Sequence, residues 1–353
     1  MAATKRIMSG MRPTGRLHLG HYFGALLNWV DFQSRYESYY SIVDWHALTT
    51  KYQDSASVPA NVFEITLDWL AVGIDPEQAT IYVQSAIPEI AEIHLLLSMI
   101  TPHNWVEREP TLKDMVRMLA QDEAEAREKA TYGLLGYPVL MSADILTFKG
   151  ELVPVGKDQE SHLEFARDVA RRFNNTYGTD FFPEPKPEFT VTPLLKGMDG
   201  MKMGKSYGND IKIADTADDT IKRVRTMVTD RTRIAKADPG HTDLCEVPWP
   251  WYKALADEQL RATVKDECEN AKIGCVDCKK RLAGLINDRF AKFRERRSKL
   301  ANDPERVFKI IDFGNTKARK VASQTLSEMR EAMGMIDWND SQKTWSKLMG
   351  TKV

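Results

Sequence analysis

Short apolar runs alternate with helical stretches in the first part of the chain. Runs rich in aliphatic, β-branched and aromatic residues predict strands at Lys5–Met8, Tyr39–Val43 and Thr80–Gln84, and residues with helical periodicity follow each of them. Repetition of strand, helix and strand favours a parallel sheet with crossover helices. The pattern therefore predicts an α/β fold for the first part of the chain.

Helical spacing is clearest between the first two predicted strands. The segment Gly20–Phe32 has apolar residues at i, i+3, i+4 and i+7, and we expect them to face the core: Phe23, Leu26, Leu27 and Val30. Further helices are expected from Glu107 to Lys129 and over Gln159–Phe173, before a proline-rich stretch at Phe182–Pro187. From about Ala214 onward the pattern is helical almost throughout, which predicts an all-α second domain.

Composition and charge narrow the class of protein. The chain has 353 residues, of which 42% are hydrophobic and 28% charged, and no apolar run approaches the length of about 20 residues that crosses a membrane. Residues 1–10 contain no apolar core of a secretory signal. We therefore expect a cytoplasmic protein with no membrane partner and with reduced thiols.

Net charge gives the chain no general attraction for a polyanion, because 49 Lys and Arg residues face 50 Asp and Glu residues. One stretch is strongly basic: nine positive residues accompany only Asp288 and Glu295, namely Lys279, Lys280, Arg281, Arg289, Lys292, Arg294, Arg296, Arg297 and Lys299. The stretch indicates either a nucleic-acid contact or the solvated face of an amphipathic helix.

Four cysteines, the only ones in the chain, lie within 34 residues. Cys245, Cys268, Cys275 and Cys278 have the spacing C-x22-C-x6-C-x2-C. In a reducing compartment this spacing indicates metal ligation, and four thiolates suit either tetrahedral Zn²⁺ or a [4Fe–4S] cluster. Free buried thiols are the alternative interpretation.

A candidate phosphate site follows the first predicted strand. Residues 9–15 read SGMRPTG, and His18-Leu19-Gly20-His21 then opens a helix. Glycines let the backbone approach a ligand, and the first turn of a helix presents free N–H groups and a positive dipole end to phosphate. Two imidazoles three residues apart add donors, although helix capping alone could also explain them.

A second candidate segment reads Lys202-Met203-Gly204-Lys205-Ser206 and follows the glycine-containing Gly197–Gly200. Two lysines on a loop can bring compact positive charge to a leaving pyrophosphate. Together, HLGH after the first strand and KMGKS about 180 residues later resemble the HIGH and KMSKS signatures of the class I aminoacyl-tRNA synthetases. Gly204 stands where that family usually has serine, which keeps both lysines but removes a hydroxyl.

Three further segments resemble the tryptophanyl branch of that family: IVDWHA at 42–47, YPVLMSADIL at 137–146 and VPVGKDQ at 153–159. With SGMRPTG and the expected helix Asn315–Met333, the resemblance extends to about Met335. It implies activation of L-tryptophan by ATP with Mg²⁺, transfer to tRNA(Trp), and a homodimer.

Asp144 fits this implied substrate on physical grounds. It stands in an apolar run, where an unpaired carboxylate would cost several kcal/mol of desolvation, so it needs a partner. An indole N–H only donates and a carboxylate only accepts, which makes Asp144 a suitable reader of tryptophan. Without the resemblance, a capping or ion-paired structural Asp is the simpler interpretation.

The resemblance also implies a role for each matching position. Catalysis is expected from His18, Gly20, His21, Lys113, Lys202 and Lys205. ATP is expected to contact Gly10, Arg12, Pro13, Thr14, Gly20, His21, Gly156, Lys157, Asp158, Lys202, Met203, Gly204, Lys205 and Ser206. Tryptophan is expected to contact Met8, Gly10, Val43, His46, Tyr137, Met141, Asp144, Asp158 and Gln159. Lys157 stands where the family usually has glutamate.

For the cysteines, the resemblance is to a bacterial subset of this branch that holds a [4Fe–4S] cluster near the tRNA anticodon, and Lys279, Lys280 and Arg281 would contact that tRNA. We accordingly expect four parts: a Rossmann-like catalytic domain at 1–213, a helical tRNA-binding domain with the cluster site at 214–313, a helix at 314–335 that packs back on the catalytic domain, and a tail at 336–353.

Two other functions share many of these features. A tyrosyl-tRNA synthetase would have the same fold and both signatures, but the segments YPVLMSADIL and VPVGKDQ favour tryptophan. A synthetase relative without activity, acting only as a nucleic-acid-binding protein, would keep the cysteines and the basic stretch. Intact HLGH and both lysines of KMGKS argue against the second alternative.

Overall fold

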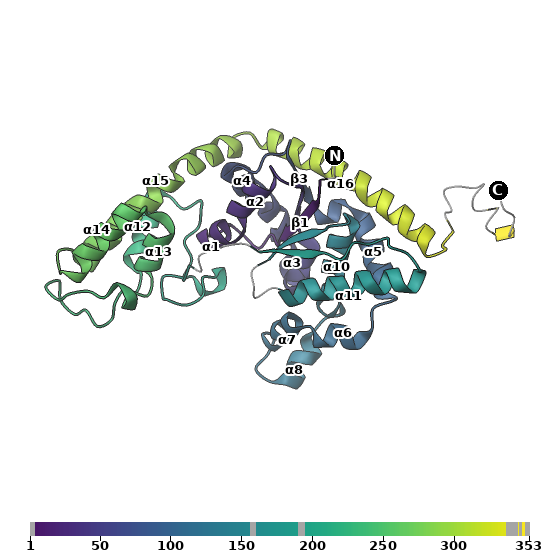
Figure 1. The fold of residues 1–353 in the computed structure, drawn as a ribbon, viewed down its shortest axis with the longest axis horizontal. Coiled ribbons are helices and arrows are strands. Elements are labelled where there is room, and N and C mark those ends of the chain that lie inside the picture. Colours follow the sequence, from purple (N-terminus) through teal and green to yellow (C-terminus); the bar gives the residue numbers. More distant parts are fainter. Residues whose placement is uncertain (1–3, 156–159, 190–194, 337–344, 346–347, 350–353) are drawn as a thin grey trace.

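A five-stranded parallel sheet forms the centre of the protein (Figure 1). The structure, a computed structural model, describes residues 4–155, 160–189, 195–336, 345 and 348–349. The strands are β1 (Arg6–Met11), β2 (Glu37–Ile42), β3 (Ala79–Val83), β4 (Leu152–Val155) and β5 (Lys186–Phe189). Their order is β3-β2-β1-β4-β5, and every neighbouring pair is parallel. The predicted Rossmann-like α/β fold is confirmed.

Strands β4 and β5 were not among the predicted strands. Both have four residues, and both contain a proline, Pro154 in β4 and Pro187 in β5. Proline cannot donate to a strand ladder and usually signals a turn, so such short segments give little strand signal on their own. The pairing with neighbouring strands, which is a tertiary feature, defines them.

Helices cover both faces of the sheet and form the rest of the chain. They are α1 (Leu19–His21), α2 (Leu27–Phe32), α3 (Asp44–Lys51), α4 (Val58–Val72), α5 (Pro88–Ser98), α6 (His103–Arg108), α7 (Pro110–Arg117), α8 (Glu123–Lys129), α9 (Tyr132–Leu135), α10 (Tyr137–Thr147), α11 (Glu160–Tyr177), α12 (Ala217–Arg225), α13 (Pro248–Leu255), α14 (Glu258–Glu269), α15 (Cys275–Ala301) and α16 (Pro304–Ala332). In the part of the chain that is described, no helix is both long and apolar enough to cross a membrane.

Successive strand residues feed two separate cores, one on each face of the sheet. Ile7, Tyr40 and Ile81 pack into the core that α4, α13 and α15 share, whereas their neighbours Met8 and Tyr39 pack into the core of α5, α10, α11 and α16. This alternation is the period of two that a strand imposes on its side chains. Residues of the helical second half thus pack directly on the first half.

The helix predicted over Gly20–Phe32 forms, and its predicted apolar residues face the core. A π-helical turn spans Tyr22–Leu26 between α1 and α2, and it inserts extra backbone into the helix. Phe23 and Leu26 are buried, and Leu27 and Val30 are partly buried against the same core. Trp29, which was not among the predicted positions, is buried more deeply than Leu27 and Val30.

The predicted helix from Glu107 to Lys129 is also interrupted. It divides into α6, α7 and α8, with breaks at Glu109 and Asp122, whose side chains each accept the N–H three residues on. These are N-caps, and an N-cap residue has extended backbone that ends any preceding helix. High helix propensity across the whole stretch concealed both breaks.

Helices α15 and α16 together arch over the whole molecule (Figure 1). At one end of the arch lie α12, α13 and α14, and at the other α16 packs along strand β3 and helix α5. Gly314 allows this approach, because a Cβ there would lie 1.8 Å from the carbonyl oxygen of Ile81. The side chain of Asn315 accepts a hydrogen bond from Val83 N–H (2.9 Å), so α16 covers the free edge of the sheet.

Candidate active site

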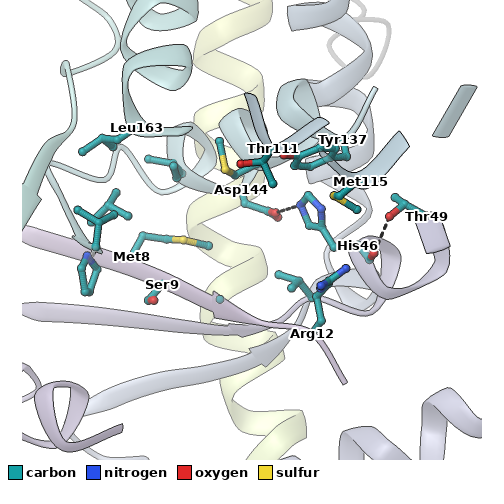
Figure 2. A pocket seen from close by; sticks show the side chains of 17 residues that line it. Met8, Ser9, Arg12, His46, Thr49, Thr111, Met115, Tyr137, Asp144 and Leu163 are labelled. Carbon is teal, nitrogen blue, oxygen red and sulfur yellow. Dashed lines mark hydrogen bonds and ion pairs between the residues drawn. The ribbon is translucent and has the colours of Figure 1, made fainter. Parts of the chain in front are cut away.

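A cavity of about 400 Å³ opens where β1 and β4 end (Figure 2). The chain leaves these two neighbouring strands toward opposite sides of the sheet, β1 toward β2 and β4 toward β5. Ligands of open α/β sheets bind at such a switch point, beyond the carboxyl ends of the strands. The cavity is lined by Met8, Ser9, Gly10, Arg12, Val43, His46, Thr49, Thr111, Met115, Tyr137, Met141, Asp144, Ile145, Val153, Pro154, Val155 and Leu163.

Most residues expected to contact tryptophan lie on this one wall: Met8, Gly10, Val43, His46, Tyr137, Met141 and Asp144. They come from β1, the end of β2, α3 and α10, which are remote in sequence. The other two, Asp158 and Gln159, lie outside the described residues, as do Gly156 and Lys157. Arg12, expected at ATP, lines the same cavity.

Asp144 is buried at 3% exposure and holds two side chains in place. Its Oδ2 accepts from His46 Nε2 (2.9 Å), and the two side chains point toward each other in Figure 2. Gln84 Nε2 donates to both carboxylate oxygens, at 2.8 and 2.9 Å. A carboxylate has about four acceptor positions, so these bonds leave Asp144 with capacity for one more donor.

Gln84 is a site residue that the sequence did not reveal. Its side chain is fully buried, and its Oε1 accepts the backbone N–H groups of Trp45 (3.0 Å) and His46 (3.3 Å). One amide therefore orients both Asp144 and the start of α3 that carries His46. Gln84 stands at the end of a strand without a motif of its own, and only the position at the carboxyl edge of the sheet could have suggested it.

Glu109 connects the cavity to α7. This carboxylate is 4% exposed; it accepts from Leu112 N (2.7 Å) as an N-cap and from Tyr137 Oη (3.1 Å). Burial and the neighbouring Glu109 charge raise the pKa of Tyr137, so the phenol keeps its proton. Thr111 and Met115 of α7 reach the cavity, whereas Lys113 on the same helix is exposed and is not part of the wall.

HLGH forms the start of the first helix, as expected. His21 Nδ1 accepts the backbone N–H of His18 (3.2 Å), so a neutral His21 ring carries its proton on Nε2. The two imidazole rings lie 3.8 Å apart. Gly20 lies between them, and a Cβ there would lie 2.9 Å from the ring of His18, so a larger residue would force that ring to move.

KMGKS lies directly against HLGH. Lys205 Nζ donates to the carbonyl oxygen of Gly15 (2.6 Å), and Leu19 N–H donates to Ile211 just after the loop (2.8 Å). Met203 is buried beside Gly20, while Lys202 is exposed. Nothing is described for the side chain of Ser206. The two signatures, about 180 residues apart in sequence, thus form one site.

Asn209 shapes this loop and was also missed by sequence reasoning. Its Oδ1 accepts from Gly204 N (2.9 Å), while its Nδ2 donates to Asp199 and to the carbonyl oxygen of Lys202 (3.1 Å). Gly204 has an extended backbone, which any residue adopts. The serine usual in the family is therefore not required for this loop conformation, because the bond between Asn209 and residue 204 uses only the backbone N–H of that residue.

Electrostatics of the paired signatures suit a phosphate ligand. Burial lowers the pKa of His18 to about 4 and that of His21 well below its usual value, and the Lys205 charge adds to both shifts. Both rings are therefore neutral at pH 7. Burial also lowers the pKa of Lys205 to about 8, although Asp210 and Asp68 oppose the shift. A bound polyanion would restore the full charge of this lysine.

The four cysteines lie close together, near the end of α14 and the start of α15. Cys245 and Cys278 are more buried than Cys268, and every pair among the four thiols interacts electrostatically. Burial, with the neighbouring thiols adding to it, raises the pKa of Cys245 to about 11. No group of three or more His, Cys, Asp or Glu side chains in the described residues is arranged to hold a metal ion.

Helix α15 distributes the basic stretch around its circumference. Several of its cations turn toward protein partners, among them Lys279, which donates to the Arg225 carbonyl (2.8 Å), Arg281, which pairs with Glu267 (2.6 Å), and Arg297, which pairs with Asp68 (2.6 Å). Lys280 is exposed. The stretch therefore does not form one continuous face, because 27 residues of helix point in every direction.

Comparison with known proteins agrees with this geometry. The family described as "tRNA synthetases class I (W and Y)" matches residues 2–291. The tryptophan–tRNA ligases of Thermotoga maritima and Aquifex aeolicus are 43% and 38% identical to the chain; each alignment covers 94% of the chain, and 99% and 100% of the relatives. The crystal structure of Campylobacter jejuni tryptophanyl-tRNA synthetase complexed with ADP and tryptophan superposes with a TM-score of 0.84 at 35% identity, covering 94% of this chain and 100% of the other. The chain therefore belongs to the class I aminoacyl-tRNA synthetases, in the branch of the tryptophan–tRNA ligases.

Proposed function

We propose that the cavity at the end of β1 binds L-tryptophan and that HLGH and KMGKS bind ATP beside it. The chain activates tryptophan to tryptophanyl-adenylate and then transfers it to tRNA(Trp). The observation that carries this assignment is the juxtaposition of the two sites: Gly10 and Arg12 line the cavity, and Gly15, a few residues on, bonds Lys205. One short segment therefore adjoins both substrates.

Activation needs alignment and charge neutralisation more than proton transfer. A carboxylate oxygen of tryptophan attacks the α-phosphate, the bond from that phosphorus to the bridging oxygen breaks, and pyrophosphate leaves with the electron pair. The tryptophan carboxylate is already an anion, so no general base is required. Neutral His18 and His21 supply N–H donors, and Lys205 with Lys202 balances the charge on pyrophosphate. Mg²⁺ bound to ATP would supply further charge neutralisation.

Asp144 is the proposed reader of the indole. Its carboxylate retains acceptor capacity after its bonds to His46 and Gln84, and it lies on the wall of the cavity. Phenylalanine offers no donor and would bury the remaining acceptor position of Asp144 without a partner, which disfavours phenylalanine relative to tryptophan. Tyrosine does offer a donor, so Met141 and Val43 must exclude it by shape.

Transfer to tRNA follows in the same site. A ribose hydroxyl of the terminal adenosine attacks the mixed anhydride, an ester bond forms, and AMP leaves. Exposed Lys280 and the other cations of α15 that point to solvent are available to the tRNA. Charging of a tRNA(Trp) transcript with labelled tryptophan tests this step. Equal charging of tRNA(Tyr) with tyrosine would contradict the assignment.

We further propose that the four cysteines hold a [4Fe–4S] cluster, with Zn²⁺ as the alternative at the same thiols. Three observations support it: the chain has no other cysteine, the four lie in one corner, and their thiols interact pairwise. Burial raises the pKa of Cys245 and Cys278, so without a cation they keep their protons, and a bound metal ion would favour the thiolate form that ligates it. Family resemblance favours iron over zinc.

Purified without oxygen, the protein is expected to be brown, with about four iron and four sulfide per chain. Cys275→Ser should bleach it and weaken tRNA charging, because Cys275 begins α15. Tryptophan-dependent ATP–pyrophosphate exchange should persist, since the cavity is built from other elements. If analysis finds stoichiometric zinc in place of iron, the cysteines form a zinc site. If it finds neither metal, these residues are free thiols.

We also propose a homodimer, as the resemblance implies. Large apolar side chains near the mouth of a second cavity support it, since Tyr52 and Tyr132 are 54% and 78% exposed and Leu95 and Met99 on nearby α5 are 52% and 69% exposed. Exposed apolar side chains gathered in one region commonly mark a protein interface. Light scattering coupled to gel filtration distinguishes a dimer from a monomer.

A further inference from the structure

Asp68 is a fully buried carboxylate whose hydrogen bonds the proposed mechanism does not use. It lies on α4, and its relative exposure is 0%. One oxygen, Oδ2, accepts the backbone N–H of Leu17 (3.3 Å), the residue directly before His18. The other, Oδ1, accepts from Arg297 Nε of α15 (2.6 Å). A single buried acid thus joins the entrance of HLGH to the helical second half of the chain.

Glu64, one turn earlier on α4, repeats the connection. Its Oε2 accepts from Arg297 Nη2 (2.5 Å) and from Arg16 Nε (2.9 Å). Arg297 therefore contacts both acids of α4 with two nitrogens of one guanidinium, a geometry that a lysine cannot reproduce. Two consecutive residues, Arg16 by its side chain and Leu17 by its backbone, are tied through these acids to the same arginine.

Burial makes Asp68 dependent on Arg297. Burial raises the pKa of Asp68, and the charge and hydrogen bond of Arg297 act against that shift. Without that cation the buried carboxylate is driven toward its protonated form, and the neutral group is a weaker acceptor for the Leu17 N–H. The position of α15 therefore influences whether Asp68 holds the backbone at the start of HLGH.

Aromatic packing also connects the helix that follows HLGH to α13 and α15. Tyr22 meets Phe290 of α15 edge to face at 4.8 Å, and Phe23 lies 6.5 Å from Trp251 of α13. Both aromatic pairs belong to one core cluster. These contacts with α13 and α15 hold the helix that HLGH opens. The polar network with Arg297 holds the residues that precede this helix.

We propose that Asp68 and Arg297 are positioning residues for ATP, and that through them the placement of α15 sets the geometry of HLGH. This inference rests on the proposed function, since it concerns the same ATP site. Neither residue is placed at the substrates. Their effect passes through Leu17 and Arg16 to the two imidazoles, and it makes adenylate formation sensitive to the state of the helical part of the chain.

Separate kinetic constants for ATP and for tryptophan test the proposal. In ATP–pyrophosphate exchange, Asp68→Asn and Arg297→Met should each lower kcat/KM for ATP on the order of 10- to 100-fold, because small displacements of binding groups are costly. KM for tryptophan should stay within about twofold, since the cavity at Asp144 shares no contact with this network. Arg297→Lys, which keeps the charge but loses the double contact, should fall between wild type and Arg297→Met.

Arg330→Met is a control. Arg330 of α16 makes a double contact with Glu92 of α5, at 2.7 and 2.6 Å, remote from HLGH. Its side chain is 30% exposed against 13% for Arg297, so its replacement should lower the melting temperature less, and it should leave the constants for ATP unchanged. If Arg297→Met likewise lowers only the melting temperature and leaves the constants for ATP unchanged, the pair is only structural and the proposal is wrong.

The pH dependence provides a readout that a structural role would not change. Lys205 is faced by Asp68 of α4, Asp210 and Lys212 after its loop, Arg12 after β1, and both signature histidines. With the protonated lysine active, kcat/KM for ATP falls as pH rises through the pKa of about 8. Removing the Asp68 charge lowers that pKa, so Asp68→Asn should move the fall to lower pH. An unchanged profile would contradict a link between Asp68 and the ATP site.

Two outcomes remain distinguishable. Wild-type protein without tryptophan-dependent exchange would defeat the proposed function itself, whereas an active wild type with unaffected variants would defeat only the positioning role. Should Asp68→Asn fail to fold, Arg16→Met and Arg297→Lys carry the test, because Arg16 is half-exposed and Arg297→Lys keeps the buried charge paired. Wild-type constants for ATP in both would overturn the proposal.

Discussion

Lys205→Ala is expected to slow formation of tryptophanyl-adenylate by about 10²- to 10³-fold, the usual cost of losing one preorganised group that balances developing charge. The ammonium group already lies at the site, bonded to the Gly15 carbonyl, so it is in place before pyrophosphate departs. Affinity for tryptophan should change little, because Lys205 is not part of the cavity wall. Single-turnover rates and equilibrium binding measure the two effects separately.

Lys309→Ala is a suitable control for Lys205→Ala. Lys309 is an exposed lysine of α16 that pairs only with Glu305 on its own helix, so its loss removes the same charge without touching the site. Lys202→Ala should reduce the rate of adenylate formation less than Lys205→Ala does, since Lys202 is exposed. A Lys205→Ala enzyme that binds tryptophan weakly yet keeps the wild-type chemical rate would assign the loop a different role.

Asp144→Asn should raise KM for tryptophan by about 10- to 100-fold, the loss that removing a charged acceptor from a hydrogen bond produces. Alanine is a poorer test, because the structure shows that the carboxylate of Asp144 also pairs with His46 and Gln84. Asp144→Ala would leave two buried donors unpaired and lower stability, so lost activity could not be assigned to the substrate.

Gln84→Glu separates the two roles of Asp144. A second carboxylate beside Asp144 should favour a shared proton and reduce tryptophan affinity while the indole acceptor is still present. Circular dichroism and thermal melting follow folding, and exchange assays give KM for tryptophan. Wild-type KM in Asp144→Asn, with normal folding, would remove Asp144 from the recognition of the indole.

Local pattern was enough to predict the parallel sheet, because β1, β2 and β3 are apolar runs with clear helices between them. It was not enough for β4 and β5, which have four residues each, contain proline, and depend on their neighbours. The π-helical turn at Tyr22–Leu26 could not be predicted either, because no residue type there signals an extra residue in the helical turn. Trp29, just after it, is buried more deeply than the predicted Leu27 and Val30.

The site divides in a similar way. HLGH, KMGKS and Asp144 were predictable because each has an unusual residue type in a short motif, and the structure places the two signatures against each other. Gln84, Glu109 and Asn209 were not, because each acts by accepting from the backbone of a residue brought near by folding. Single-sequence reasoning identifies groups that face a ligand more readily than groups that hold them.

Lys113 illustrates the opposite case. Resemblance assigned it to the triphosphate, yet its side chain is exposed while Thr111 and Met115 on the same helix reach the cavity. Residues two apart on a helix point to nearly opposite sides, so Lys113 and its two neighbours cannot face the cavity together. Its assignment to ATP stays a prediction, because an exposed lysine outside the tryptophan cavity can still contact the triphosphate, as is proposed for Lys202.

Exchange of pyrophosphate into ATP shows directly whether this chain activates tryptophan with ATP. Labelled pyrophosphate should enter ATP when L-tryptophan is present, and the incorporation should disappear when the amino acid is omitted. Replacing tryptophan by tyrosine or phenylalanine should lower kcat/KM by several orders of magnitude, as expected when the site's acceptor is left without a suitable donor or the side chain does not fit. Exchange that depends equally on tyrosine, or no exchange with any amino acid, would contradict the account.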